Sequence, residues 1–373
     1  MLRFAFRFIR YDKIKSIGVI VGIIICTSLV GQQVGIFLFL TGAMSSLVDN
    51  TSADLWIIDN RTTDANALGH LDMRVGRQVE SIPGVGTVSP LIVTAGTAKF
   101  LGGRSAPVTI IGSQPPAFAG GPWKISRGTS ADLLQEGAVT IDTYERPNLN
   151  NADIGTSFEL NGRRVFVAVM TKGARGFGAA YVFTPLDRAR ALAKIPPTKA
   201  SAFLVKLEGG ADPIAVRDTI NATVFGIRAW TKADLSRSTV RTILATSGIA
   251  FSIGTLILFA GVAGIIIIGL TMYSAAVDRL RDYGTFKAIG ADNRVVRRLI
   301  LTQALFFAMS AYGFSVLLIE GFRRGIANSG IVFEYSPAFK AAFFFITLSI
   351  ALVGALFAMR RLGKLEPASV FRQ

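Results

Sequence analysis

The side chains able to form or break covalent bonds are few in this 373-residue chain, and their scarcity limits the chemistry it can perform. It has one histidine, His70, and one cysteine, Cys26. A Ser–His–Asp triad would have to use His70, and a zinc cluster needs more His and Cys residues than these. The sequence contains neither a G-x-x-x-x-G-K-[ST] phosphate loop nor a G-x-S-x-G nucleophile elbow. We therefore expect no catalytic, cofactor-binding or metal-binding residues, and we interpret His70 as a surface residue.

The stretch from Tyr273 to Ala291 has a pattern suited to binding. Its apolar residues share one helical stripe: Val277, Leu280, Tyr283, Phe286 and Ile289. Its charged residues face away from that stripe: Arg279, Arg281, Asp282 and Lys287. Gly290 is a helix-stop signal. A helix that docks on a polar partner and an ordinary solvated helix between two membrane spans both fit this pattern.

The stretch from Tyr273 to Ala291 adjoins long apolar runs of the sequence, and these must position it. The chain is 51% hydrophobic and 17% charged, whereas soluble domains average about 25% charged residues. A helix needs about 20 apolar residues to cross a bilayer, so we predict four transmembrane helices, at 14–44, 242–276, 295–319 and 339–360. Small residues four positions apart, which permit close helix packing, occur in these runs: Gly18 and Gly22, Gly31 and Gly35, Ala260 and Gly264.

The net charge of +16 is concentrated beside these runs. Segments at and around 1–13, 277–294 and 361–373 contain fifteen Lys and Arg residues against five Asp and Glu residues. Short basic segments stay in the cytoplasm, and four crossings place all three on that side. We therefore expect both termini in the cytoplasm, a cytoplasmic amphipathic helix over 1–13, and residues 45–241 and 320–338 outside. Most of the positive charge then reflects membrane orientation, and we expect no nucleic-acid partner.

Residues 45–241 have the pattern of a mixed α/β extracytoplasmic domain. Strand–helix–strand occurs twice, at 53–59, 68–82 and 85–100, and again at 201–207, 212–223 and 224–230. Two such units predict one ferredoxin-like lobe. A β-rich insert lies between them at about 105–195, and Asn161-Gly162 indicates a hairpin within it. The Gly-rich stretch from Thr171 to Ala180 is a candidate contact loop for a partner.

Two cytoplasmic motifs resemble those of a known family. Arg281-Asp-Tyr-Gly-Thr-Phe-Lys-Ala-Ile-Gly-Ala291 resembles the R-E-x-G-x-L-[RK]-A-[IL]-G-A segment of the FtsX-like, or MacB-type, ABC transporter permeases. Arg361-Leu-Gly-Lys-Leu-Glu-Pro-Ala-Ser-Val-Phe-Arg372 is similar to the family ending, in which a basic stretch precedes P-x-x-x-L-R. One helix, a large outer domain and then three helices is also the layout of that family.

The resemblance implies which residues contact the energy source. In the family the first motif follows the second transmembrane helix and docks on an ATPase subunit. The implied ATPase-coupling residues are Arg279, Arg281, Asp282, Tyr283, Gly284, Phe286, Lys287, Ala288, Ile289 and Gly290. The implied C-terminal motif residues are Arg361, Pro367 and Arg372. Three residues depart from the family pattern, because Asp282 and Gln303 replace Glu and Phe371 replaces Leu. Asp282 keeps the negative charge, whereas Gln303 removes any salt bridge at its position.

The resemblance also implies a function. The chain would be a non-catalytic, MacB-type permease in the bacterial inner membrane, a homodimer bound to a separate ABC ATP-binding protein. It would couple ATP hydrolysis to its outer domain by mechanotransmission and drive efflux of a lipophilic or periplasmic substrate. The two-lobed outer domain favours the exporter branch, including DevC-type permeases that work with a periplasmic membrane-fusion adaptor. An FtsX-like regulator of a cell-wall hydrolase, a LolC-like lipoprotein release subunit, and a stand-alone channel or receptor are the alternatives.

Overall fold

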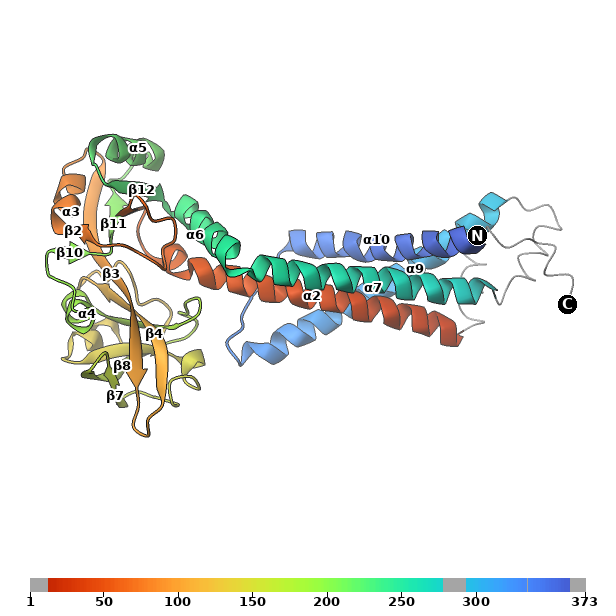
Figure 1. The fold of residues 1–373 in the computed structure, drawn as a ribbon, viewed down its shortest axis with the longest axis horizontal. Coiled ribbons are helices and arrows are strands. Elements are labelled where there is room, and N and C mark those ends of the chain that lie inside the picture. The colour runs from red at the N-terminus through yellow and green to blue at the C-terminus, as the bar shows by residue number, and fades with distance from the viewer. Residues whose placement is uncertain (1–12, 278–292, 334, 363–373) are drawn as a thin grey trace, which may run out of the picture. The chain divides into compact units, whose positions relative to one another are not determined.

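The computed structural model describes residues 13–277, 293–333 and 335–362, which form two compact units. The helical unit contains the described residues up to 38, those of 249–327, and those from 331 onward. The α/β unit contains residues 39–248 and 328–330 (Figure 1).

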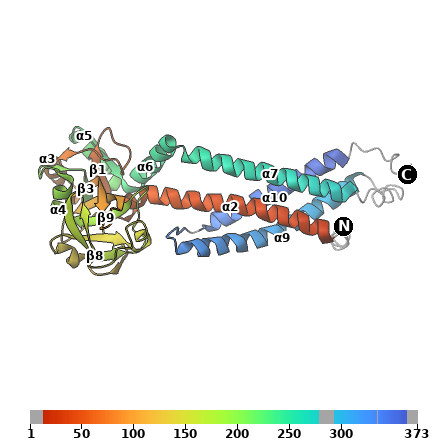
Figure 2. The same ribbon diagram turned by 60° about the horizontal axis from the view of Figure 1, so that its bottom comes forward.

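The helical unit is built from α2 (Lys13–Asn50, shared with the α/β unit), α7 (Ile249–Val277), α9 (Asn293–Ala327) and α10 (Pro337–Leu362). Each is long and apolar enough to cross a membrane, over Ser16–Asn50, Ile249–Ser274, Arg297–Ala327 and Pro337–Phe357. Figure 2 shows the four helices side by side in this unit, from a second direction. The predicted fold class, four transmembrane helices with a mixed α/β outer domain, is confirmed.

Small and polar side chains let these helices approach each other closely. The Thr27 and Ser315 hydroxyl oxygens lie 2.7 Å apart and hydrogen-bond α2 to α9. A Cβ atom on Gly31 would overlap the Ile319 side chain and approach Cε2 of Phe343 to 3.3 Å. In apolar surroundings helix association depends on such packing and on interhelical hydrogen bonds, because water expulsion adds little there. Gly31 is therefore a close-contact position between α2, α9 and α10.

The Gly31→Val variant is expected to destabilise the helical unit. The added side chain must displace Ile319, and overpacking of this kind costs about 1–3 kcal/mol. Gly313→Val is the matched control, because no atom lies within 4 Å of a Cβ built there. Thermal unfolding of the detergent-purified full chain, followed by circular dichroism, measures the difference. Equal loss of stability in both variants would contradict the assigned contact.

Two helix boundaries differ from those expected from the sequence. The predicted helix over 242–276 is divided into α6 (Lys232–Ser247) and α7, because Gly248 adopts a left-handed conformation at φ 68° that ends α6. Residues 320–327, predicted as the start of a loop, extend α9. In that last turn Glu320 forms ion pairs with Arg323 and Arg324 at i+3 and i+4, a spacing that supports helix.

The α/β unit contains one large sheet and several short helices. Its strands are β1 (Leu55–Asp59), β3 (Val85–Lys99), β4 (Ser105–Ser113), β5 (Ile125–Arg127), β6 (Ala138–Asp142), β7 (Ser157–Leu160), β8 (Arg163–Thr171), β9 (Ala180–Pro185), β11 (Ala202–Leu207) and β12 (Ile227–Thr231). The pair β2 (Leu71–Asp72) and β10 (Lys199–Ala200) is separate. The helices are α3 (Met73–Glu80), α4 (Leu186–Ala193), α5 (Pro213–Thr223) and α6, with short 3₁₀ turns η1 (Ser130–Leu134) and η2 (Thr143–Glu145).

The first lobe has the strand order β12-β1-β11-β3, with every neighbouring pair antiparallel. Helix α3 connects β1 to β3, and α5 connects β11 to β12, so two βαβ units interleave as predicted for a ferredoxin-like lobe. Asp212 caps α5 by accepting a hydrogen bond from the Ile214 amide, with Pro213 at the first helical position.

The β-rich insert forms the second lobe around the far half of β3. Residues Leu91–Lys99 of β3 pair with β4, which pairs in parallel with β9. Strands β7 and β8 form the predicted hairpin, in which Leu160 pairs with Arg163. Asn161 and Gly162 both have positive φ, 50° and 82°, as a two-residue hairpin loop requires. Because β3 belongs to both lobes, they share one sheet.

Candidate functional site

The sequence-predicted coupling residues lie outside the described residues. This applies to Arg279–Gly290 and, in the C-terminal motif, to Pro367 and Arg372. Arg361 belongs to the last turn of α10. His70 is exposed, just before β2. The site that the structure describes is a different one and lies within the α/β unit, where the end of α2 and helix α6 pack on the sheet.

We call this site the stalk junction. It comprises the end of α2 (39–50), helix α6 (232–247), the connecting loop 60–70, and the sheet face on which they pack. Strand β1 explains why both helices are held there, because its residues Leu55, Trp56, Ile57 and Ile58 are all fully buried. Successive side chains of a strand point to opposite faces, so a run of four buried apolar residues requires cover on both faces.

The two faces of β1 belong to different apolar clusters. Leu55 and Ile57 pack with residues of α3 and α5. Trp56 and Ile58 pack in a cluster that contains Leu47 and Val48 of α2 and Leu235 of α6. Full burial of one such aliphatic side chain contributes about 1.5–3 kcal/mol. The end of α2 is thus part of the core of the α/β unit (Figure 1).

Polar side chains fix the position of the α2 end within this core. The Asn66 side-chain amide donates to the Met44 carbonyl at 2.7 Å, and the Tyr181 hydroxyl donates to Oδ1 of Asn66 at 3.4 Å. Trp56 Nε1 donates to the Thr51 hydroxyl, and Lys232 Nζ donates to the Thr51 carbonyl at 2.8 Å. The Met44 carbonyl in α2 and the Thr51 carbonyl just beyond it are therefore bound by Asn66 of the connecting loop and Lys232 of α6. Trp56 of β1 and Tyr181 of β9 in turn bind the Thr51 hydroxyl and the Asn66 side chain.

Helix α6 is attached to the same connecting loop. The Thr239 hydroxyl accepts a hydrogen bond from the Ala65 amide at 3.0 Å, and the Ser238 hydroxyl donates to the Thr63 carbonyl at 2.9 Å. Thr239 is fully buried, so its loss would leave the Ala65 amide without this partner. Loop 60–70 thus links α2 and α6 by hydrogen bonds.

Burial and charge at the junction shift two pKa values. Burial, together with the nearby Asp64 carboxylate, raises the pKa of Tyr181 far above its usual range, so its hydroxyl stays a donor. Burial would raise the pKa of Asp54, but the Leu207 amide and the Lys206 ammonium outweigh it and hold that pKa below its usual value. Asp54 therefore stays charged and joins the start of β1 to β11.

The Gly-rich loop predicted as a partner contact is held by its own chain over its first half. The buried Asp142 carboxylate accepts hydrogen bonds from the Thr171 hydroxyl and from the Gly173 and Ala174 amides, all within 2.7–2.8 Å. This arrangement positions Arg175, which pairs with Glu145 and places its guanidinium 5.7 Å from the ring centre of Phe39 in α2. The second lobe therefore also contacts α2.

The Asp142→Ala variant is expected to unfold the α/β unit at lower temperature. It leaves several buried donors unpaired, and each costs about 1–3 kcal/mol, so we expect a loss of roughly 3 kcal/mol or more. Asp142→Asn, which keeps one acceptor oxygen, should lose less. The three tryptophans, Trp56, Trp123 and Trp230, all belong to this unit, so tryptophan fluorescence of the full chain reports on it. Equal, small effects of both variants would refute the role assigned to Asp142.

Comparison with known protein families identifies this architecture. The family profile of the MacB-like periplasmic core domain matches residues 16–223, and that of the FtsX-like permease C-terminal region matches residues 254–367. The chain belongs to the FtsX-like, MacB-type ABC transporter permeases. The first match contains the α2 part of the stalk junction. The second spans the positions of Arg279–Gly290, Arg361 and Pro367, while Arg372 lies beyond it.

Individual relatives of this permease are distant in sequence. Two ABC transporter permeases of uncharacterized role, from two strains of Mycobacterium tuberculosis, are each 24% identical over 310 residues, which cover 78% of this chain and 79% of theirs. The extracellular domain of the ABC-type transporter YknZ from Gram-positive bacteria is 14% identical, with a TM-score of 0.36 and coverage of 48% of this chain and 99% of that domain. The periplasmic region of MacB from Actinobacillus actinomycetemcomitans is 13% identical, with a TM-score of 0.37 and coverage of 53% and 96%.

The stalk junction was not predicted from the sequence. Its polar residues, such as Asn66 and Thr239, are common surface types, and nothing in their spacing marks them. The one available signal was the unbroken apolar run Leu55–Ile58, which indicates a strand covered on both faces. What covers the second face depends on contacts between distant parts of the chain.

Proposed function

We propose that this permease is the non-catalytic membrane subunit of an ABC exporter, which converts ATP hydrolysis by a separate subunit into motion of its outer domain. Membership of the family implies an ATP-binding partner and a membrane setting. The finer proposal is mechanotransmission for the efflux of a lipophilic or periplasmic substrate. We further propose a homodimer in the bacterial inner membrane, with both termini in the cytoplasm and a periplasmic adaptor.

The observation that supports this proposal is the continuity of α2. This helix runs unbroken from Lys13 to Asn50, and its last turns lie in the core of the α/β unit. At 1.5 Å per residue its 38 residues extend about 57 Å, more than the roughly 30 Å of hydrocarbon in a bilayer. A helix held at its outer end by buried contacts can transmit displacement, because interior packing resists compression.

The proposed input to this motion is the segment Arg279–Gly290. Its mixed charges suit a polar docking surface, since complementary charges set the register of an interface. The sequence has no phosphate loop, so the energy has to come from another chain. Helix α7 follows α6 after the break at Gly248, so this second passage of the chain between the two units is interrupted, whereas α2 is continuous.

A pull-down of the tagged full chain from its native membranes tests the proposal. We expect an ABC ATP-binding protein in roughly equal amounts with the permease, together with a periplasmic adaptor. Recovery of a cell-wall hydrolase in place of the adaptor would favour the regulator. Recovery of the chain without any ATP-binding protein would refute the coupling function and leave a channel or receptor.

A further inference from the structure

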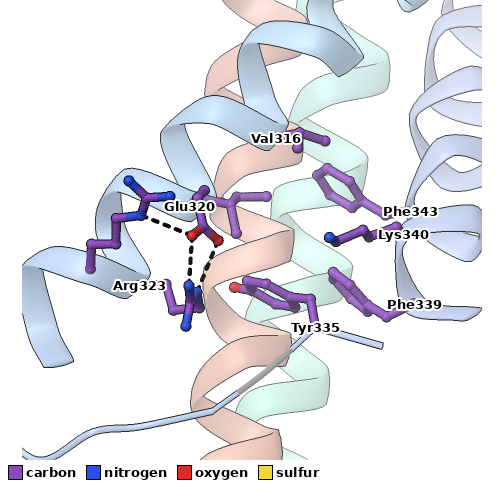
Figure 3. Close-up of a pocket in the computed structure, with 9 residues that line it drawn as sticks. Val316, Glu320, Arg323, Tyr335, Phe339, Lys340 and Phe343 are labelled. Carbon is purple, nitrogen blue, oxygen red and sulfur yellow. Dashed lines mark hydrogen bonds and ion pairs between the residues drawn. The ribbon is translucent and has the colours of Figure 1, made fainter. Parts of the chain in front are cut away.

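A pocket of about 340 Å³ lies in the helical unit between the end of α9 and the start of α10 (Figure 3). This volume is within the range of small-molecule sites. The end of α9 is followed in the chain by residues 328–330, which belong to the α/β unit. On the proposed topology, this end of α9 is therefore the extracytoplasmic one. Figure 3 shows Glu320 and Arg323 of α9 facing Tyr335 and Phe339.

The residues that line the pocket have an excess of positive charge, contributed by α9 and by Lys340, which lies between Phe339 and Phe343 of α10 (Figure 3). Glu320 accepts hydrogen bonds from Arg323, at 2.9 and 2.6 Å, and from Arg324 at 3.0 Å. One carboxylate thus serves two guanidinium groups. Lys340 lines the same pocket, and it makes no salt bridge within the part of the chain that the structure describes. The pocket-lining residues therefore hold two more positive charges than negative ones.

The α10 side of the pocket is mostly aromatic, and its rings are fixed in place. The ring of Tyr335 stacks on Phe339, with centres 4.6 Å apart, and Phe339 stacks on Phe343 at 5.7 Å. The Tyr335 hydroxyl donates to the Gly31 carbonyl of α2 at 3.0 Å, which fixes the start of this column. Val316 and Ile319 of α9 complete the apolar end.

On the α9 side, the polarity of the pocket lining follows the direction of the membrane normal expected for a spanning helix. From Val316 to Arg324, α9 advances eight residues, about 12 Å, towards its extracytoplasmic end. Basic side chains at helix ends lie at the headgroup level of a bilayer, with apolar residues deeper. A matching ligand therefore has an anionic head at this level and an apolar chain directed into the bilayer.

We propose that this pocket binds an anionic glycerophospholipid of the surrounding membrane. Its phosphate would lie against Arg324 and Lys340, because guanidinium and ammonium groups form strong charge-assisted hydrogen bonds with phosphate. An acyl chain would lie along Phe339 and Phe343 to Val316. A free phosphate would contact only the charged side chains and would leave the aromatic side chains of the pocket without a ligand contact. The proposal goes beyond the export function, since lipid binding requires neither the ATP-binding subunit nor a transported substrate.

The test uses the full chain in detergent micelles doped with equal amounts of phosphatidylglycerol and phosphatidylcholine, with bound lipid counted by mass spectrometry. We expect phosphatidylglycerol to be enriched on the wild-type chain. Replacing Arg324 and Lys340 with Gln should lower its affinity about fivefold for each charge removed. Val316→Trp should also lower binding, because the indole fills the apolar end while leaving the charges in place.

Matched variants and competitors make the outcome decisive. The double variant Arg163→Gln and Arg164→Gln removes two exposed charges from the α/β unit and should leave the enrichment unchanged. Circular dichroism confirms that each variant keeps its helices. No preference for phosphatidylglycerol in the wild type would overturn the proposal. So would displacement of the lipid by millimolar inorganic phosphate together with normal binding by Val316→Trp, which would indicate a simple anion site.

Discussion

The Gly42→Pro variant is expected to abolish ATP-dependent motion of the outer domain while leaving the ATP-binding subunit bound. Gly42 lies inside α2, eight residues before its end, and is exposed. Proline there removes the backbone hydrogen bond to Leu38, clashes with that carbonyl and kinks the helix, at a cost of about 3 kcal/mol. The buried contacts of Leu47 and Val48 hold the end of α2 in the junction, so the kink should absorb the displacement.

Gly42→Ala is the control at the same position. No atom lies within 4 Å of a Cβ built on Gly42, and alanine favours helix over glycine by about 0.5–1 kcal/mol. Hydrogen–deuterium exchange of the purified complex, with and without ATP, measures the coupling without requiring a known substrate. In the wild type and in Gly42→Ala, ATP should change exchange in residues 44–70. The same change in Gly42→Pro would contradict transmission through α2.

Reversing two charges in the coupling segment is expected to release the ATP-binding subunit. The Arg281→Glu and Lys287→Glu double variant places negative charge where the proposed docking surface requires positive charge, and like charges across an interface cost several kcal/mol. A loss of only about 1.4 kcal/mol of binding free energy already weakens binding tenfold. We therefore expect little or no ATP-binding protein in a pull-down. Membrane insertion should be unchanged, as judged by the amount of chain in the membrane fraction.

The matched control reverses two charges far from this segment in sequence. Arg163 and Arg164 are exposed at the start of β8 in the α/β unit, so the Arg163→Glu and Arg164→Glu variant changes net charge equally. It should retain the ATP-binding subunit in full. Survival of the complex in the Arg281 and Lys287 variant would show that the docking assignment is wrong, even if another surface binds the partner. This experiment is therefore independent of the α2 test.

Much of the fold could be predicted because its signals are local. Runs of apolar residues longer than a bilayer requires predict the spanning helices, and Asp212-Pro213 marks the start of α5. Asn161 and Gly162 adopt the positive φ angles that a two-residue hairpin needs. The repeated strand–helix–strand pattern indicated the ferredoxin-like lobe, because each unit must bury one face of its helix on the sheet.

The ends of helices were harder to predict, because they depend on side-chain pairing. The extension of α9 to Ala327 follows from the ion pairs that Glu320 makes with Arg323 and Arg324 in its final turns. From hydropathy alone, these charged residues are predicted to begin a loop. The break at Gly248 could not be predicted from the pattern of apolar residues either, because glycine occurs throughout the spanning helices. It is the left-handed conformation of Gly248 that ends α6.

The sequence by itself determined the family, the fold class and the segment proposed to meet the ATP-binding subunit, because these rest on composition and on contiguous motifs. Only the tertiary structure decided how α2 and α6 are held in the outer domain. Asn66 reaches Met44, and Ala65 meets Thr239 across 174 positions of sequence. The pocket between α9 and α10 likewise exists only when both helices are placed side by side. Contacts of this kind leave no periodic signal, because each joins two residues whose types are ordinary in their own segments.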